Sequence, residues 1–158
     1  AVRGTRAKIL DTRKTVPGLR FLDKMAVRVG GGTNHRFGLY DAVLIKDNHI
    51  EAAGGITAAV AAQRKFLKKK MKIEVETKNL REVQEALQCG VDIIMLDNMT
   101  KDTISLALSI INGKAKVEVS GNMDEHTLQE ISDLPIDYVS VGALTHSVKA
   151  FDLTMRLI

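Results

Sequence analysis

The sequence predicts an α/β fold, most simply one parallel β/α barrel of the TIM type with about six strands, whose closure the sequence leaves open. Three observations predict this class. Short apolar runs typical of buried strands recur along the chain, segments with helical periodicity separate them, and polar residues follow each run. With 158 residues, of which 45% are hydrophobic, the chain can bury one sizeable core, so we expect a single domain over residues 1–158.

Six runs rich in Val, Ile and Leu predict the strands, because β-branched side chains favour extended backbone. They cover residues 8–11, 42–45, 72–75, 92–96, 115–119 and 137–141. Apolar residues spaced three and four positions apart predict helices around 80–87, 104–111 and 128–131, and the glycines at 30–32 end an earlier helix. Strands that alternate with helices are typical of parallel sheets joined by helical crossovers.

The helix ends carry their own signals. Gly90 and the Asn112-Gly113 pair can adopt a positive φ and end two helices, while Thr77 and Thr100 are placed to accept hydrogen bonds from the first amides of the next ones. These signals support the alternation of strands and helices.

Polar residues follow every predicted strand. They are Thr12-Arg13-Lys14, Lys46-Asp47-Asn48-His49, Glu76-Thr77, Asp97-Asn98, Ser120-Gly121-Asn122 and Gly142-Ala143. A parallel barrel collects the carboxyl ends of its strands at one mouth, so these residues would converge there, whereas a doubly wound sheet would place useful residues mainly around one switch point. Ordinary loops also begin with polar residues, but six such endings in succession favour a common site.

Two pairs of basic residues are candidates for anion binding. Arg13 and Lys14 follow the first strand directly, and His35 and Arg36 follow the three glycines. An Arg fork can bind a carboxylate or phosphate through two hydrogen bonds, and Lys adds a flexible charge. A solvated basic turn is the alternative. The glycines do not identify a nucleotide site, since neither a GxxxxGK[ST] nor a GxGxxG motif is present.

The candidate catalytic residues are Lys46, Glu76 and Asp97. Lys46 could bind an anion, form a Schiff base or pair with Asp47. Glu76 and Asp97 could hold Mg²⁺ through water, bind ribose hydroxyls or stabilise a developing cation, or they could only neutralise Lys46 and Arg36. Spacing alone does not choose between these roles.

Phosphate binding is predicted at the last two strand ends. Ser120-Gly121-Asn122 and Val141-Gly142-Ala143 follow these strands, where barrels often bind phosphate through backbone amides and a helix N-terminus. The formal net charge of +4 suits acidic ligands without identifying them.

Several other classes are disfavoured. Cys89 is the single cysteine, no apolar run approaches the roughly 20 residues of a membrane span, and no secretory leader opens the sequence, so we expect a soluble, cytoplasmic protein. The basic run at 64–72 is interpreted as a solvated helix end, and nucleic acid is not expected as a partner. His35, His49 and His146 lack the spacing of a zinc site, so no structural zinc is expected.

Several stretches together closely resemble one enzyme family. They are residues 9–20 (ILDTRKTVPGLR), 30–36 (GGGTNHR), 44–50 (LIKDNHI), 74–76 (EVE), 95–98 (MLDN), 118–122 (EVSGN) and 140–147 (SVGALTHS). These stretches span nearly the whole chain, which resembles nicotinate-nucleotide pyrophosphorylase (carboxylating), also called quinolinate phosphoribosyltransferase. The resemblance implies a β/α barrel that joins quinolinate to 5-phosphoribosyl 1-diphosphate, with Mg²⁺, and forms nicotinate mononucleotide, pyrophosphate and CO₂ in NAD biosynthesis.

The resemblance also implies a role for each matching residue. The substrate-binding set is Thr12, Arg13, Lys14, His35, Arg36, Lys46, Glu76 and Asp97. Within it, the basic residues look like the quinolinate pocket, and Glu76 and Asp97 resemble the acidic pair near the ribose and metal. Ser120, Gly121, Asn122, Val141, Gly142 and Ala143 resemble the phosphate-binding strand ends. The family also implies a homodimer or a higher homo-oligomer.

The chain departs from the family in extent and at one position. Family members carry an N-terminal α/β domain and a helical segment before the Thr12-Arg13-Lys14 strand, so we expect this chain to be the barrel portion without that domain. Asn122 stands where many relatives have a second glycine. The alternatives are a phosphate-binding lyase or aldolase that uses Lys46 covalently, and a non-catalytic assembly fragment.

Overall fold

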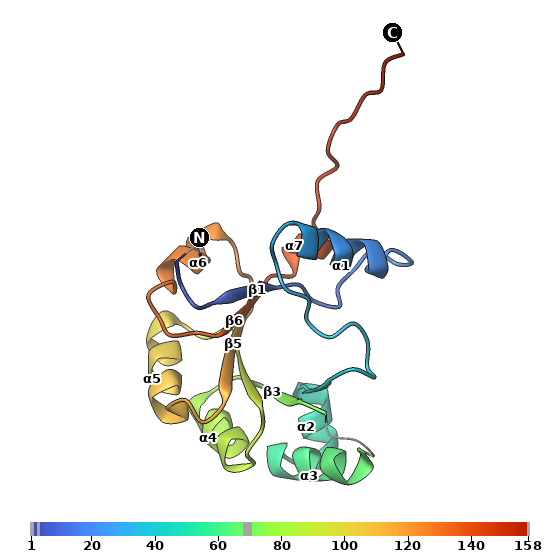
Figure 1. Ribbon diagram of the computed structural model, residues 1–158. Helices are drawn as coiled ribbons and strands as arrows, with labels where there is room; N and C mark the ends of the chain where they lie inside the picture. The colour runs from blue at the N-terminus through green and yellow to red at the C-terminus, as the bar shows by residue number, and fades with distance from the viewer. Residues whose placement is uncertain (1, 3, 68–70, 158) are drawn as a thin grey trace.

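One sheet of six parallel strands forms the centre of the structure, a computed structural model that describes residues 2, 4–67 and 71–157 (Figure 1). The strands are β1 (Lys8–Leu10), β2 (Val43–Ile45), β3 (Ile73–Thr77), β4 (Ile93–Asp97), β5 (Lys116–Ser120) and β6 (Tyr138–Ser140). Their order in the sheet is β1-β6-β5-β4-β3-β2, and every pairing is parallel. The predicted α/β class and the six predicted strands are confirmed, with bounds that shift by one or two residues.

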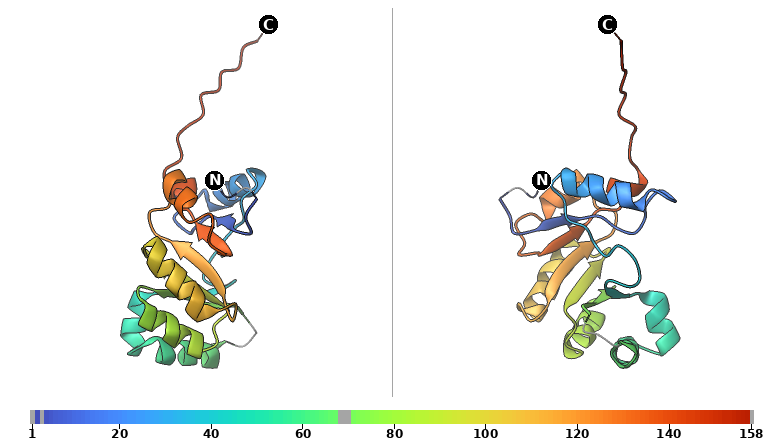
Figure 2. Two further views of the ribbon diagram at one scale, coloured as in Figure 1. Left: turned by 90° about the vertical axis from the view of Figure 1, so that its left-hand side faces the viewer. Right: turned by 45° about the vertical axis from the view of Figure 1, so that its right-hand side comes forward.

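Helices connect the strands and cover the outer side of the sheet (Figures 1 and 2). They are α1 (Arg20–Val29), α2 (Asp47–Ala53), α3 (Ile56–Phe66), α4 (Leu80–Gln88), α5 (Lys101–Ile111), α6 (Glu125–Glu130) and α7 (Ala143–His146). Arg64 and Lys65 lie in the last turn of α3, as expected of a solvated helix end, while residues 68–70 of the predicted basic run lie outside the described residues. No helix among the described residues is long and apolar enough to cross a membrane.

The two faces of the sheet carry different residues because side chains alternate along each strand. On β3, Ile73 and Val75 pack into the core beneath the helices, whereas Glu74 and Glu76 lie on the opposite, concave face. The core is completed by apolar residues of α3, α4 and α5, among them Val60, Val83, Ala107 and Ile111. The helix-covered face is aliphatic, whereas the concave face carries the charged residues together with Leu44 and Met95.

One predicted helix cap is wrong. Thr100 accepts a hydrogen bond from the Thr103 amide at the start of α5, as expected. Helix α4, however, is capped by Asn79, whose Oδ1 accepts from the amides of Arg81 and Glu82, and not by Thr77. Strand β3 continues to Thr77, whose buried hydroxyl donates to the Met95 carbonyl of the neighbouring strand.

The sheet is not closed, because β1 and β2 are its two edges and do not pair with each other. The segment from residue 30 to 42 crosses this open side between the two edges (Figure 2). Thr33 in this segment makes a single parallel bridge to Leu10, so the segment adds a short substitute for a strand beside β1. His35 and Arg36 follow directly, and the open side of the sheet therefore presents them to its concave face.

Candidate active site

A cavity of about 770 Å³ opens at the carboxyl ends of the strands, where the sequence predicts the site. It is lined by the predicted residues Thr12, Arg13, Lys14, His35, Arg36, Lys46, Glu76, Asp97, Ser120, Gly121, Asn122, Gly142 and Ala143. Val141 is the exception. Its side chain packs in the core and its amide donates to the Leu10 carbonyl, so neither is left to bind a phosphate.

Three of the cavity's cations lack an anionic partner. Within residues 2, 4–67 and 71–157, Arg13, Lys14 and Arg36 form no ion pair. Arg13 Nε is buried and donates to no acceptor in that part of the chain. Burial, reinforced by the charge of Arg13, lowers the pKa of the Arg36 guanidinium from its ordinary value. Unpaired, partly buried guanidinium groups that repel each other are stabilised when an anion binds between them.

The loop that carries His35 and Arg36 is anchored by a buried ion pair. Asp11 is 0% exposed, and its Oδ1 lies 2.5 Å from Lys24 Nζ, which is also buried. The same carboxylate accepts hydrogen bonds from Asn34 Nδ2 at 2.5 Å and from the His35 amide at 2.8 Å, and Lys24 Nζ also donates to the His35 carbonyl at 3.0 Å. These contacts tie β1 and α1 to the loop on both sides of the His35 peptide.

The acidic residues differ in their partners. Lys46 forms an ion pair with Glu76 across the strand ends, while Asp47 pairs with Lys78 at 3.0 Å. The expected alternative of a Lys46–Asp47 pair is therefore wrong, and the alternative in which Glu76 neutralises Lys46 describes the geometry. Lys46 Nζ is therefore held by a carboxylate, whereas a Schiff base would need this nitrogen to be free to attack a carbonyl carbon. Asp97 accepts one hydrogen bond from Asn98 and otherwise faces the cavity.

The strand ends after β4 and β5 form a tightly packed corner. Gly121 has φ +105°, and a Cβ there would lie 2.3 Å from Asn98 Oδ1 and 2.8 Å from the Asn98 amide nitrogen. Only glycine fits this contact. Asn122 has φ +45°, a left-handed conformation that Asn tolerates better than most residues, so Asn fits this position without glycine.

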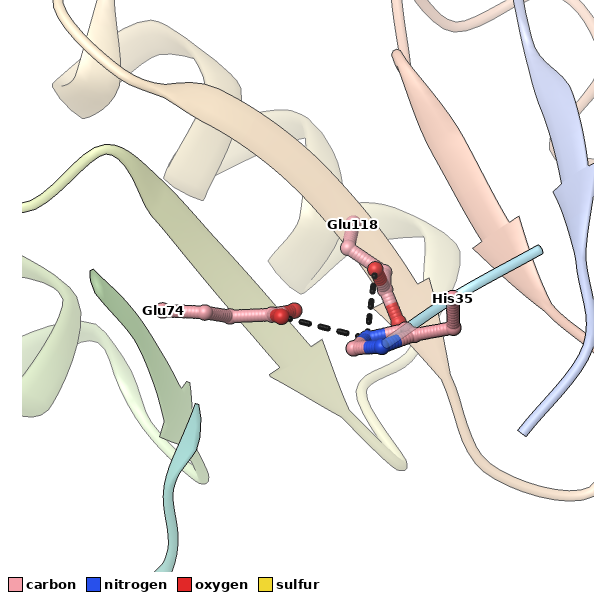
Figure 3. Close-up of side chains that lie close together, drawn as sticks. All are labelled: His35, Glu74 and Glu118. Carbon is pink, nitrogen blue, oxygen red and sulfur yellow. Dashed lines mark ion pairs between the residues drawn. The ribbon is translucent and has the colours of Figure 1, made fainter. Parts of the chain in front are cut away.

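Two buried glutamates that the sequence analysis did not single out lie beside His35 (Figure 3). Glu74 on β3 and Glu118 on β5 place carboxylate oxygens 3.1 Å and 3.5 Å from His35 Nε2. Burial and the charge of Glu74 raise the pKa of Glu118 well above the ordinary carboxyl value. Strand alternation was the available signal, because it places Glu74 on the same face as Glu76, and Glu118 on the same face as Ser120.

Comparison with known proteins gives consistent matches along the chain. Residues 1–156 match the family described as "Quinolinate phosphoribosyl transferase, C-terminal domain". The chain is 47% identical to the chloroplastic nicotinate-nucleotide pyrophosphorylase (carboxylating) of Arabidopsis thaliana, covering 96% of this chain and 49% of that protein. It is 46% identical to a probable nicotinate-nucleotide pyrophosphorylase (carboxylating) of Bacillus subtilis, covering 94% and 51%. The solved nicotinate-nucleotide pyrophosphorylase of Francisella tularensis aligns with a TM-score of 0.92 at 48% identity, over 97% of this chain and 54% of that one. The chain thus spans about half the length of the relatives that it matches.

Proposed function

Because the chain belongs to the quinolinate phosphoribosyltransferase family, through the family's C-terminal domain, we propose that it carries the catalytic barrel of a decarboxylating phosphoribosyltransferase. The reaction joins quinolinate to 5-phosphoribosyl 1-diphosphate and yields nicotinate mononucleotide, pyrophosphate and CO₂. Relatives with 46–47% identity carry names for this activity. These relatives are about twice as long as the matched region, so the activity of the whole enzyme is proposed for this chain and not shown by the comparison.

The unpaired cations carry the proposal. Quinolinate is an aromatic dicarboxylate, and Arg13, Lys14 and Arg36 supply positive charge without an anionic partner in the described part of the chain. Arg side chains bind carboxylates through two parallel hydrogen bonds, which fixes the orientation of a planar ring as well as its position. A monocarboxylate such as nicotinate is expected to bind less tightly, because it lacks the second anionic group.

The acidic pair serves the phosphoribosyl half of the reaction. When the pyridine nitrogen attacks the anomeric carbon and pyrophosphate leaves, positive charge develops on the ribose, and the carboxylates of Glu76 and Asp97 stabilise it. The quaternised ring nitrogen then stabilises the carbanion left at carbon 2 when CO₂ departs. No separate electron-sink cofactor is needed for this step.

Glu76 and Asp97 also offer the oxygen donors that Mg²⁺ prefers. Two carboxylates together with the oxygens of a diphosphate fit the usual coordination of this ion, in which the protein supplies one or two ligands and the substrate supplies others. When held there, Mg²⁺ would supply positive charge that stabilises the departing pyrophosphate. Ser120, Gly121, Asn122, Gly142 and Ala143 are the proposed phosphate-binding positions.

A quinolinate-dependent pyrophosphate-release assay tests the proposal. It compares this chain alone with the chain joined to an upstream domain of the kind that longer relatives carry. We expect turnover in the joined protein, with Glu76→Gln and Asp97→Asn lowering kcat/KM strongly while quinolinate affinity stays near the wild-type value; Tm is also expected to stay near wild type in Asp97→Asn. Absence of turnover in both proteins would reject the assignment, and borohydride trapping at Lys46 with a carbonyl substrate would support a lyase instead.

The surface of α1 supports the proposed homo-oligomer. Phe21, Met25 and Val29 are exposed at 68%, 48% and 83% and recur at every fourth position, so they form one apolar stripe. A second copy of the protein is the proposed partner of this stripe. Sedimentation of the wild type and of Val29→Asp tests this, since a stable monomer in both cases would remove the stripe from the interface.

The cytoplasmic location predicted from the sequence is likewise a proposal, which cell fractionation tests.

A further inference from the structure

The floor of the anion-binding cavity contains a feature that its charge does not explain. Glu74 and Glu118 are both buried beside His35, which lines the cavity together with the predicted quinolinate-binding cations, although negative charge near that cavity weakens the binding of a dianion. The side chain that lies between them is His35 (Figure 3). Its hydrogen bonds indicate why at least one of the glutamates is present.

The hydrogen bonds assign the tautomer of His35. The backbone amide of Arg36 donates to His35 Nδ1 at 2.7 Å, so Nδ1 is an acceptor and the proton of the neutral ring lies on Nε2. Nε2 lies 3.1 Å from Glu74 Oε2, within ion-pair distance, so Glu74 is the nearer of the two carboxylates to the ring. Glu118 lies farther away, at 3.5 Å, and neither of its oxygens has a hydrogen-bond partner among the described residues. The two glutamates are therefore not equivalent.

We propose that Glu74 is a positioning residue, which fixes the imidazole of His35 and, through Nδ1, fixes the backbone of Arg36 at the cavity. The chain of contacts runs from β3 to the ring of His35 and from the ring to the next peptide. Asp11 and Lys24 hold the His35 backbone from the other side, and Arg36 Nη1 donates to the Ala42 carbonyl.

The consequence is preorganisation of the Arg36 guanidinium. A flexible loop would have to be ordered when the substrate binds, which costs binding free energy, whereas a loop already held in place avoids that cost. This inference rests on the proposed function for its substrate. The positions of the His35 ring and of the Arg36 amide can be tested without any substrate.

A metal ion is the competing explanation of the cluster. His35, Glu74 and Glu118 each offer a ligand atom, and these atoms lie within 4.8 Å of one another. A metal binds a ring nitrogen that carries no proton, and here the Arg36 amide leaves the proton on Nε2, the nitrogen that faces both carboxylates. The tautomer therefore disfavours coordination at Nε2, and the test includes the metal alone.

Nitrogen-15 spectra of the imidazole groups provide the test. The protein has four histidines, so a His35→Asn sample assigns the signals of His35. Three variants of the complete 158-residue chain are compared with the wild type. Glu74→Met removes the acceptor at similar volume, Glu74→Gln keeps an amide oxygen that can accept from Nε2, and Glu118→Gln is the matched control on the other strand. Amide hydrogen exchange of Arg36 is measured on the same samples.

The wild type and Glu74→Gln are expected to show Nε2 protonated and Nδ1 unprotonated, and Glu118→Gln is expected to keep that pattern. In Glu74→Met the two nitrogen signals should move toward a tautomeric mixture, and exchange of the Arg36 amide should be faster. Quinolinate affinity, measured by calorimetry in the protein joined to the upstream domain, should fall about two- to ten-fold in Glu74→Met and recover in Glu74→Gln.

Several results would overturn the proposal. In the wild type, a His35 ring protonated on Nδ1 would overturn it, as would loss of the Nε2 proton when Zn²⁺ alone is added. In the variants, a Glu74→Met spectrum equal to that of the wild type would overturn it, as would a spectral change in Glu118→Gln as large as that in Glu74→Met. Unchanged quinolinate affinity in Glu74→Met would also overturn it. If the wild type binds no quinolinate, the proposed function fails, while the spectra and amide exchange still decide whether Glu74 positions His35 and Arg36.

Discussion

Replacing Asp11 by Asn is expected to destabilise the protein more than any other single change that conserves volume at the loop. The side chains of Asp11 and Lys24 are 0% and 3% exposed, and their charged atoms are 2.5 Å apart. Asn at position 11 would keep one oxygen that can accept from Lys24 Nζ, beside the His35 carbonyl, but it would leave the buried Lys24 ammonium without a negative charge. A buried ion that has lost its partner costs about 3–5 kcal/mol.

The expected loss is large compared with the whole stability of the protein. Domains have free energies of unfolding of about 5–15 kcal/mol, so Asp11→Asn would remove a substantial fraction. At about 2–4 °C per kcal/mol for a chain of this size, Tm should fall by about 6–20 °C. Urea unfolding followed by circular dichroism gives the free energy, and a thermal scan gives Tm.

A double variant separates the unpaired charge from other effects. Asp11→Asn with Lys24→Met removes both charges, so it should recover most of the stability that the single variant loses. Asp133→Asn is the matched control, because its ion pair with Lys101 lies on the exposed surface and should matter little. The reasoning is refuted if Asp11→Asn unfolds within about 1 kcal/mol of the wild type, or if the double variant is no more stable than the single one.

Four other variants give three further predictions. Arg13→Ala and Arg36→Ala should each weaken quinolinate binding by about 1.5–3 kcal/mol in calorimetric titrations, with partial rescue by Lys, and unchanged affinity in both would remove them from the acid pocket. Gly121→Ala should lower Tm and pyrophosphate release together, because its Cβ would lie 2.8 Å from the Asn98 amide nitrogen; a wild-type Tm would contradict the packing. Folded Glu118 keeps its proton to a higher pH than unfolded Glu118, so its contribution makes stability fall as pH rises from the ordinary carboxyl pKa of 4.5 through the raised value. Urea unfolding at about pH 5 and about pH 8 should therefore show a smaller decline in Glu118→Gln than in the wild type, and equal declines would exclude Glu118 as the cause.

Strand positions and the location of the site could be predicted because both depend on local patterns. Runs such as 92–96 are apolar and β-branched, and the carboxyl ends of parallel strands meet at one edge whatever the details of packing. The cap of α4 could not be predicted from residue type alone, since both Thr and Asn cap helices. The pairing of β3 with β4 decides between them, because it draws Thr77 into the sheet.

The partners of the charged residues depend on distances that no local pattern contains. Lys46 has an acidic neighbour in Asp47, yet it pairs with Glu76, because β2 and β3 lie side by side and the Asp47 carboxylate contacts Lys78. Glu74 and Glu118 were missed for a related reason. Each stands inside a predicted strand, and their closeness to His35 follows from a loop that crosses the open side of the sheet.

Side chains alternate along each strand, so residues that stabilise the fold and residues that contact the ligand lie on opposite faces of the sheet. On β5, Val117 and Val119 face the helices, whereas Glu118 and Ser120 face the cavity. A substitution at a cavity-facing position can therefore alter ligand specificity without changing a core residue, although the two positions are adjacent in the chain. Mutations can accumulate at one set of positions while the other set is kept under constraint, so the same scaffold is open to evolving toward new anionic substrates without first gaining stability.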